Sequence, residues 1–290
     1  MQQRRFICLE RGAGMRWRRY MPRLLSVGLA GGLALLGVAC RTGVDPTLPE
    51  NAVLFAPLPR YRLWWELTSQ CAGASRSFED VQWYLVPGVS SFQTDQGELG
   101  GAYYRAQNRI VLAELVSDSA GVVRHEMLHA LLRIAVAHPA TYFQRRCAGI
   151  VNCDGPCARE IDRTPSDTGA TRVAPSELSL DLALYPANGR LRDSGGWYVA
   201  VASVTNQRSI PVRVALPAKG LGKYLSFAYT DDCWTITNLS FSSSIDLGPG
   251  ETRYHAFDHQ WCRSDAAGSL TARASLGGDS TSVRHWLIQP

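Results

Sequence analysis

The sequence predicts an α+β domain followed by an all-β domain, and two patterns along its 290 residues support this order. In the first half, an amphipathic helical pattern over residues 119–136 follows the β-branched, apolar run 109–113. In the second half, short alternating runs are separated by Gly and Pro turn signals, which is typical of a β-sandwich. We expect the first domain to cover residues 56–165 and the second to cover residues 170–290.

The first 40 residues have the pattern of an export signal. Seven arginines and one glutamate give residues 1–40 a charge of +6, and an apolar run of 16 residues ends at Ala39. This run is short for a membrane span, although an uncleaved membrane anchor is the alternative. The end of the run, Leu36-Gly37-Val38-Ala39-Cys40, resembles the lipobox of bacterial lipoproteins. The resemblance implies that Cys40 is lipidated and that the exported protein is anchored on the periplasmic or surface side of the bacterial cell envelope. Residues 41–55 are rich in Pro, Asp and Gly, and we expect them to form a tether from the lipid to the first domain.

The rest of the chain is almost neutral. Setting the charges of the signal aside leaves 23 of the 30 basic residues and 24 of the 25 acidic ones. A body without a basic field has little attraction for a phosphate backbone. We therefore expect no nucleic-acid partner, and expect a membrane contact only through the lipid anchor.

Six cysteines follow the signal, and an even number in an exported protein is typical of disulfide bonds. Proximity along the chain favours the pairs Cys233–Cys262 and Cys153–Cys157, which leaves Cys71–Cys147. The alternative is a structural zinc site formed by Cys147, Cys153 and Cys157, although no fourth ligand stands nearby at the usual spacing.

The helix expected at residues 119–136 has two different faces. At 100° per residue, one broad arc is apolar and holds Val123, Met127, Leu128, Leu131, Ile134 and Ala135. His125 and His129 fall on the opposite side, so burial of the apolar face presents both histidines together. Arg124 is the exception, because it falls within the apolar arc and needs either a partner or a route to water.

The histidine face carries the motif His125-Glu126-Met127-Leu128-His129. Two histidines at i and i+4 can bind one Zn²⁺, and the glutamate after the first histidine can reach a water bound to the metal. Such a glutamate accepts the proton of that water while the water attacks a carbonyl group. The motif predicts a zinc metallopeptidase with Glu126 as general base and a peptide or protein substrate; the alternative for the motif itself is a helix with two exposed histidines and no metal.

Residues 110–113 followed by 122–132 resemble the zincin metallopeptidases, in which an edge strand precedes the active-site helix. The resemblance extends over about residues 61–157 and implies a zincin-like α+β peptidase domain. The metzincin subclass is excluded, because Leu132 and Ala135 occupy the places of its Gly and third His.

His138 is the expected third zinc ligand. Pro139 disfavours continuation of the helix, and a helix that ends near Ala137 lets the chain turn and bring His138 back to the metal. The segment 138–143 also resembles the SprT-like zincins, where a third His shortly after the helix is followed by an aromatic residue. A glutamate ligand, either Glu160 or Glu177, is the alternative.

A peptidase site of this kind is also expected to hold a group that stabilises the transition state. A tyrosine can stabilise the transition state; Tyr142 is our candidate, and Tyr103 and Tyr104 remain open.

The run 246–252 followed by Phe257-Asp258 resembles the late strand pair of bacterial immunoglobulin-like accessory domains, which implies an immunoglobulin-like sandwich. The alternative functions are a cell-surface binding lipoprotein with a structural or vestigial zinc site, and a β domain that covers the cleft of its own peptidase.

Overall fold

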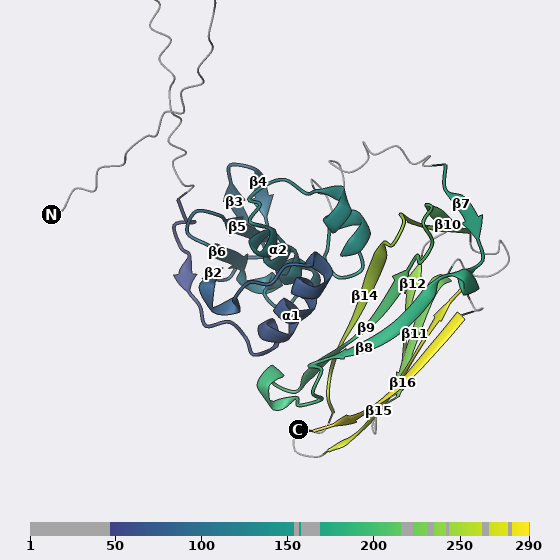
Figure 1. Cartoon of the computed structure of the whole chain (residues 1–290). Coiled ribbons are helices and arrows are strands. Elements are labelled where there is room, and N and C mark those ends of the chain that lie inside the picture. The colour runs from purple at the N-terminus through teal and green to yellow at the C-terminus, as the bar shows by residue number, and fades with distance from the viewer. Residues whose placement is uncertain are drawn as a thin grey trace, which may run out of the picture. The chain divides into compact units, whose positions relative to one another are not determined.

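The computed structural model describes residues 47–153, 157, 169–215, 223–230, 235–241, 244–262, 267–277 and 280–289. The signal peptide, Cys40, Glu160, Cys233 and the expected boundary near residue 165 lie outside these residues. Residues 44–290 form one compact unit (Figure 1). The unit contains few helices and several sheets, which confirms the α+β class. Most of its regular secondary structure is β-strand.

The described elements of residues 47–157, here the α/β region, include two α-helices and a four-stranded sheet in the order β1-β2-β6-β5. The helices are α1 (Arg60–Ala72) and α2 (Ala120–Leu132). The strands are β1 (Val53–Leu54), β2 (Gln82–Val86), β5 (Gly101–Tyr104) and β6 (Arg109–Ala113), and β3 (Phe92–Thr94) forms a separate hairpin with β4 (Gly97–Leu99). Strand β1 therefore starts within the stretch expected to be a tether.

Strand β6 is apolar on both faces because each face packs into a different core. Ile110 and Leu112 face the core around the two helices, and Val111 and Ala113 face a smaller core with Tyr104. Strand β2 runs parallel to β6, and β5 runs antiparallel to it at the edge of the sheet. The expected strand at 109–113 has these same bounds, and it leads into α2 through a short 3₁₀ turn.

Helix α2 is shorter than the expected helix of residues 119–136. It ends at Leu132 because Arg133 adopts a left-handed conformation with φ 56°, after which the Ile134 amide donates to the His129 carbonyl at 3.1 Å. This closure is a common way for a helix to end. The chain therefore turns before Ile134, and it resumes a helical course only in η3, the π-helix Thr141–Arg146.

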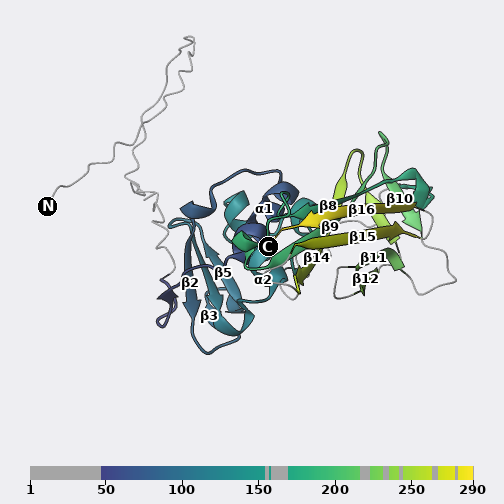
Figure 2. The same ribbon diagram turned by 90° about the horizontal axis from the view of Figure 1, so that it is seen from below.

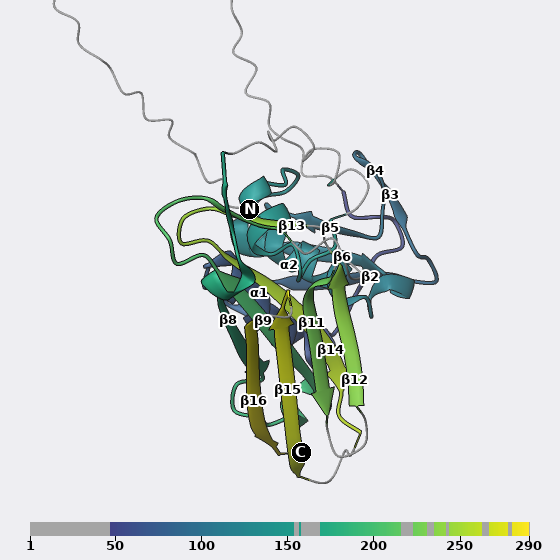
Figure 3. The same cartoon turned by 90° about the vertical axis from the view of Figure 1, so that its right-hand side faces the viewer.

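The described part of residues 169–289 is built from strands and short 3₁₀ turns, and we call it the two-sheet region after its two larger sheets. One sheet has the order β14-β9-β8, a second has β12-β11-β15-β16, and a small third has β13-β10-β7. The first two lie face to face in Figure 3. The strands of the three sheets are β7 (Thr171–Val173), β8 (Ser179–Tyr185), β9 (Trp197–Thr205), β10 (Val212–Ala215), β11 (Lys223–Thr230), β12 (Thr235–Phe241), β13 (Ser244–Leu247), β14 (Thr252–Gln260), β15 (Gly268–Leu276) and β16 (Ser280–Ile288).

Strand β9 is buried on both faces, which explains its nearly continuous apolar sequence. Ala200 and Ala202 face the core enclosed by the two sheets, together with Leu270 and Ala272 of β15. Val199 and Val201 point the other way and join the core of α1 and α2. Figure 2 shows β2 and β5 on one side of the helices and the two-sheet region on the other. The two regions therefore share a hydrophobic core.

Two disulfide bonds agree with the expected pairing, Cys71–Cys147 and Cys153–Cys157. The alternative of a zinc site formed by Cys147, Cys153 and Cys157 is wrong, because all three sulfurs are used in these bonds. Cys262 is also disulfide-bonded. Within the residues that the structure describes, no helix combines the length and the apolar character needed to cross a membrane.

Candidate metal centre

Three histidine side chains converge beside α2. His125 and His129 come from successive turns of the helix, and His138 comes from the turn that precedes η3. Their Nε2 atoms lie 3.1 Å (His125–His129), 3.2 Å (His125–His138) and 3.1 Å (His129–His138) apart. The structure therefore brings together the three histidines named from the sequence.

The far side of two of the imidazole rings is fixed by backbone carbonyl groups. His125 Nδ1 lies 2.7 Å from the Asn152 oxygen, and His129 Nδ1 lies 2.9 Å from the Ile134 oxygen. Since a carbonyl oxygen only accepts, both Nδ1 atoms must carry the proton and donate it. In each neutral ring Nε2 is then left with a lone pair that points into the centre of the cluster, as a metal ligand requires.

This set of donors fits a divalent metal ion. Two lone pairs that face each other at 3.1 Å repel unless a cation lies between them. In a tetrahedral zinc site with metal–nitrogen distances of about 2.0–2.1 Å, the nitrogens are about 3.3 Å apart, close to the spacing found here. Phe143 of η3 closes the apolar side of the cluster, with its ring centroid 4.8–5.0 Å from each imidazole centroid. The three histidines can therefore hold a metal ion.

Burial keeps the rings of His125 and His129 neutral. Burial, and after it the nearby His138, lowers the pKa of His125 to about 4. The pKa of His129 is lowered for the same reason, first by burial and then by His125 and His138. Because only a neutral imidazole binds a metal, this environment favours the ligand form over the protonated form at neutral pH.

Glu126 is a buried carboxylate that lines the same cavity, with 6% of its surface exposed. No described residue donates a hydrogen bond to it, and burial raises its pKa to about 8. Gly101 makes room for this side chain, because a Cβ at position 101 would lie 2.8 Å from Glu126 Cγ. Strand β5 thus approaches the helix closely at the glutamate, and the carboxylate is left to interact with the contents of the cavity.

The cavity has a volume of about 680 Å³. Helix α2, strand β5, the β3–β4 hairpin and the turn after α2 form its walls, and Tyr103, Tyr104, Arg105 and Arg133 lie among the lining residues. Among the described residues, none beyond Cys157 lines it. The described strands of the two-sheet region therefore contribute no residue to the lining of this cavity.

Two residues named from the sequence lie elsewhere. Tyr142 is partly buried against the core and does not line the cavity, whereas Tyr103 and Tyr104 do. The phenol of Tyr103 donates to Asn108 Oδ1 at 2.9 Å. Glu177 accepts a hydrogen bond from the Ala174 amide and pairs with Arg208, so it is not part of the histidine cluster.

Several supporting residues have no motif in the sequence. The carbonyl of Asn152 and the space at Gly101 act through the backbone, and neither leaves a signal in the residue type. Phe143 belongs to the segment 138–143, and it lies against the histidines, whereas its neighbour Tyr142 does not line the cavity. Among these supporting residues, only Arg124 is indicated by the sequence, because a charged residue on an apolar helix face requires a polar partner.

Replacing His138 with alanine is expected to weaken binding of Co²⁺ or Zn²⁺ by at least about 100-fold, more than the loss typical for residues that only support a ligand. The reason is the loss of one of three converging nitrogens. Competition with a chromogenic chelator measures this affinity. His285→Ala is the matched control, because His285 is exposed on β16 and contacts Thr271. Unchanged affinity in His138→Ala would mean that the third ligand is another residue.

No protein-family model and no curated protein matches the sequence. Among solved structures, a β-glucosidase from Listeria innocua in complex with glucose is 11% identical with a TM-score of 0.24, over 39% of this chain and 16% of that one. The alkylpurine DNA glycosylase AlkC from Pseudomonas fluorescens, bound to DNA with an abasic site analog, is 16% identical with a TM-score of 0.26, over 60% of this chain and 50% of that one. A FixG-related protein from Vibrio parahaemolyticus is 12% identical with a TM-score of 0.21, over 39% of this chain and 94% of that one. This chain thus spans half or less of the first two proteins, and at these TM-scores none of the three bears on its function.

Proposed function

We propose that this protein is an exported zinc metallopeptidase that uses Glu126 as general base. One observation carries the proposal: the buried carboxyl group of Glu126, to which no described residue donates a hydrogen bond, lines the same cavity as three converging imidazole nitrogens. Leaving such a carboxylate unpaired costs free energy, which natural proteins tolerate mainly where the group has a chemical task.

His125, His129 and His138 would hold the zinc ion through their Nε2 atoms. When bound, zinc would lower the pKa of water and polarise a substrate carbonyl group. The carboxylate of Glu126 would take a proton from the attacking water and return it to the leaving amine, which is the general base and then general acid role. Tyr103 and Tyr104 line the cavity and replace Tyr142 as our candidates to stabilise the developing negative charge.

A peptide is the substrate class that suits the cavity wall. Among the described strands, β5 lies at the edge of its sheet and pairs with β6 alone, so no described strand pairs with the backbone groups of its other edge. All four of its residues, from Gly101 to Tyr104, line the cavity. An extended peptide can bind to such an edge as an additional strand, which would bring a peptide bond next to the histidines.

The zincin-like architecture of the α/β region and the immunoglobulin-like architecture of the two-sheet region are part of this proposal. The first is supported by a sheet whose edge strand borders the motif helix, and the second by two facing antiparallel sheets. Lipid anchoring at Cys40 also remains a proposal, and the two disulfide bonds are consistent with an oxidising compartment.

The test is zinc content together with hydrolysis of an unfolded protein such as labelled casein. We expect about one zinc ion per chain, and we expect Glu126→Gln to lower the hydrolysis rate by about 10²–10⁴-fold, the usual contribution of a general base. Zinc content should stay unchanged in this variant because Glu126 is not one of the three converging donors.

Glu79→Gln is the control for loss of a carboxylate, because Glu79 is exposed and pairs with Arg62, and neither residue lines the cavity. Wild-type protein without stoichiometric zinc would refute the proposal. Zinc binding without any hydrolysis that depends on Glu126 would favour the alternative of a surface binding protein.

A further inference from the structure

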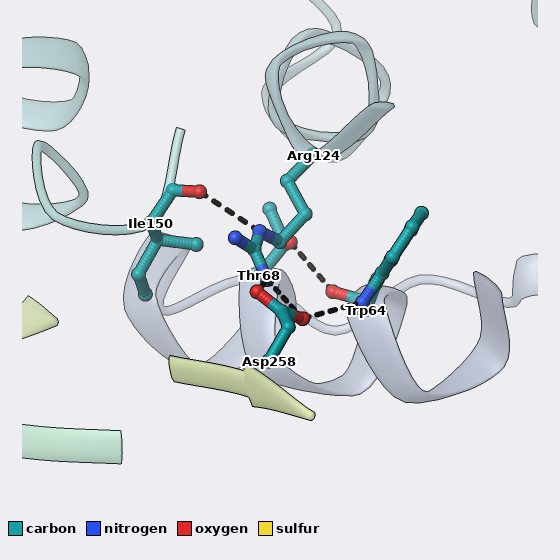
Figure 4. Close-up of polar contacts among 5 residues, drawn as sticks. All are labelled: Trp64, Thr68, Arg124, Ile150 and Asp258. Carbon is teal, nitrogen blue, oxygen red and sulfur yellow. Dashed lines mark hydrogen bonds and ion pairs between the residues drawn. The ribbon is translucent and has the colours of Figure 1, made fainter. Parts of the chain in front are cut away.

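Arg124, the residue before His125, is buried in the interface between the two regions. Its side chain is 5% exposed and points from α2 toward β14, where its Nη1 atom lies 2.9 Å and 2.8 Å from the two carboxylate oxygens of Asp258 (Figure 4). Trp64 of α1 donates from Nε1 to Asp258 Oδ1 at 2.7 Å. A strand 134 residues away in sequence thus supplies the carboxylate for an arginine of the motif helix.

The same arginine holds the loop that orients His125. Its Nε atom donates to the Ile150 carbonyl at 2.8 Å, as Figure 4 shows. Two residues later, the Asn152 carbonyl accepts the Nδ1 proton of His125. The amide of Asn152 also donates to the Gly121 carbonyl at 3.0 Å, which ties the loop to the first turn of α2.

Strand β14 contacts this loop a second time through the backbone. The Ala256 amide donates to the Gly149 carbonyl at 3.0 Å, and Gly149 forms an isolated β-bridge with His255. A Cβ at position 149 would lie 2.4 Å from the Tyr254 oxygen and 2.4 Å from His255 Nδ1. Only glycine permits this approach, so the loop and the strand are in direct contact at that point.

We propose that β14 of the two-sheet region positions His125 for metal binding, with Asp258 as the positioning residue. Asp258 acts through Arg124, which fixes the loop 149–152 at Ile150, and the loop in turn fixes the tautomer and the direction of His125. The inference rests on the metal site proposed above but does not depend on peptidase activity.

Stability alone is a weak reason for this ion pair. A buried pair often adds little stability compared with apolar residues of the same size, because both charges lose their hydration. Its geometric consequence is specific, since the pair connects one strand of the distant sheet to the residue adjacent to a metal ligand. Supporting groups of this kind typically change metal affinity by about 10–100-fold when they are removed.

Asp258→Asn in the full-length protein is the main test, with Co²⁺ as the probe. The substitution keeps the size of the side chain and removes its charge. We expect the Co²⁺ affinity to fall by about 10–100-fold, and we expect a changed visible absorption spectrum because the ligand geometry is altered. Asp246→Asn is the matched control: Asp246 pairs with Arg213 through two hydrogen bonds of 2.6 Å and 2.8 Å in the small sheet of the same region. This control should keep the wild-type affinity and spectrum.

Gly149→Ala provides a second variant if Asp258→Asn fails to fold, since it moves the loop away from β14 without removing a charge. It should also lower Co²⁺ affinity and change the spectrum. Circular dichroism at the titration temperature shows which variants are folded. Wild-type affinity and spectrum in a folded Asp258→Asn, or in Gly149→Ala where Asp258→Asn does not fold, would overturn the positioning role and leave the metal site intact. Failure of the wild-type protein to bind Co²⁺ would instead overturn both.

Discussion

A chain that ends at residue 165 is expected neither to fold stably nor to bind metal. The core of α1 and α2 includes Tyr185, Val199 and Val201. Removing the residues after 165 would therefore expose apolar surface that the helices bury in the full chain. Arg124 would also lose Asp258, and breaking a buried ion pair costs about 3–5 kcal/mol. That loss is a large share of the roughly 5–15 kcal/mol by which domains are stable.

Soluble yield, circular dichroism and chelator competition would measure this outcome after expression in an oxidising compartment. The matched control is a chain of residues 44–290, which should fold because these residues form one compact unit. A soluble fragment of residues 1–165 that melts cooperatively and hydrolyses peptides faster than the full chain would contradict the expectation. That result would instead support a β region that inhibits its own peptidase.

The sequence was sufficient to predict the local part of the site. The positions of His125 and His129 follow from helical geometry alone, and β6 follows from its β-branched, apolar residues. Pro139 correctly indicated that the chain leaves the helix before His138. The helix nevertheless ends four residues before the expected residue 136, because Arg133 adopts a left-handed conformation that its residue type does not predict.

The non-local part could not be predicted from the sequence. Arg124 required a partner, but nothing along the chain distinguishes Asp258 from the other acidic residues. Strand β14 carries Arg, His and Asp between its apolar residues, since parts of it contact polar groups of the α/β region rather than a uniform core. A pattern based on alternating hydrophobicity therefore misses the strand that connects the two regions.

The contacts of β9 and β14 make the two-sheet region a structural part of the α/β region rather than a separate accessory domain. From the sequence, the two-sheet region is an accessory domain beyond a linker. In the structure, β9 completes the core of α1 and α2, and β14 contacts both Arg124 and the loop behind His125. We therefore expect substitutions in β14 to alter the metal site although no described residue of this strand lines the cavity.

The double substitution Cys71→Ser/Cys147→Ser is expected to destabilise the protein strongly. Both cysteines are fully buried, and their bond joins α1 to the start of the loop that continues to Asn152, across a separation of 76 residues. A bond that closes a loop of this size lowers the entropy of the unfolded chain, which corresponds to about 4–5 kcal/mol of stability. Urea unfolding followed by circular dichroism would measure the loss.

Cys153→Ser/Cys157→Ser is the matched control, because its bond spans only four residues and the same relation gives it about 2 kcal/mol. The two double variants should thus differ by about 2–3 kcal/mol in the free energy of unfolding. Equal losses would contradict this ranking and would mean that native packing around each sulfur, rather than loop entropy, determines the effect. Metal affinity gives a further check. The Cys147 carbonyl accepts hydrogen bonds from the Ile150 and Val151 amides, so loss of the disulfide at Cys147 should make the nearby Asn152 carbonyl, which orients His125, more mobile. We therefore expect Cys71→Ser/Cys147→Ser to weaken metal binding as well.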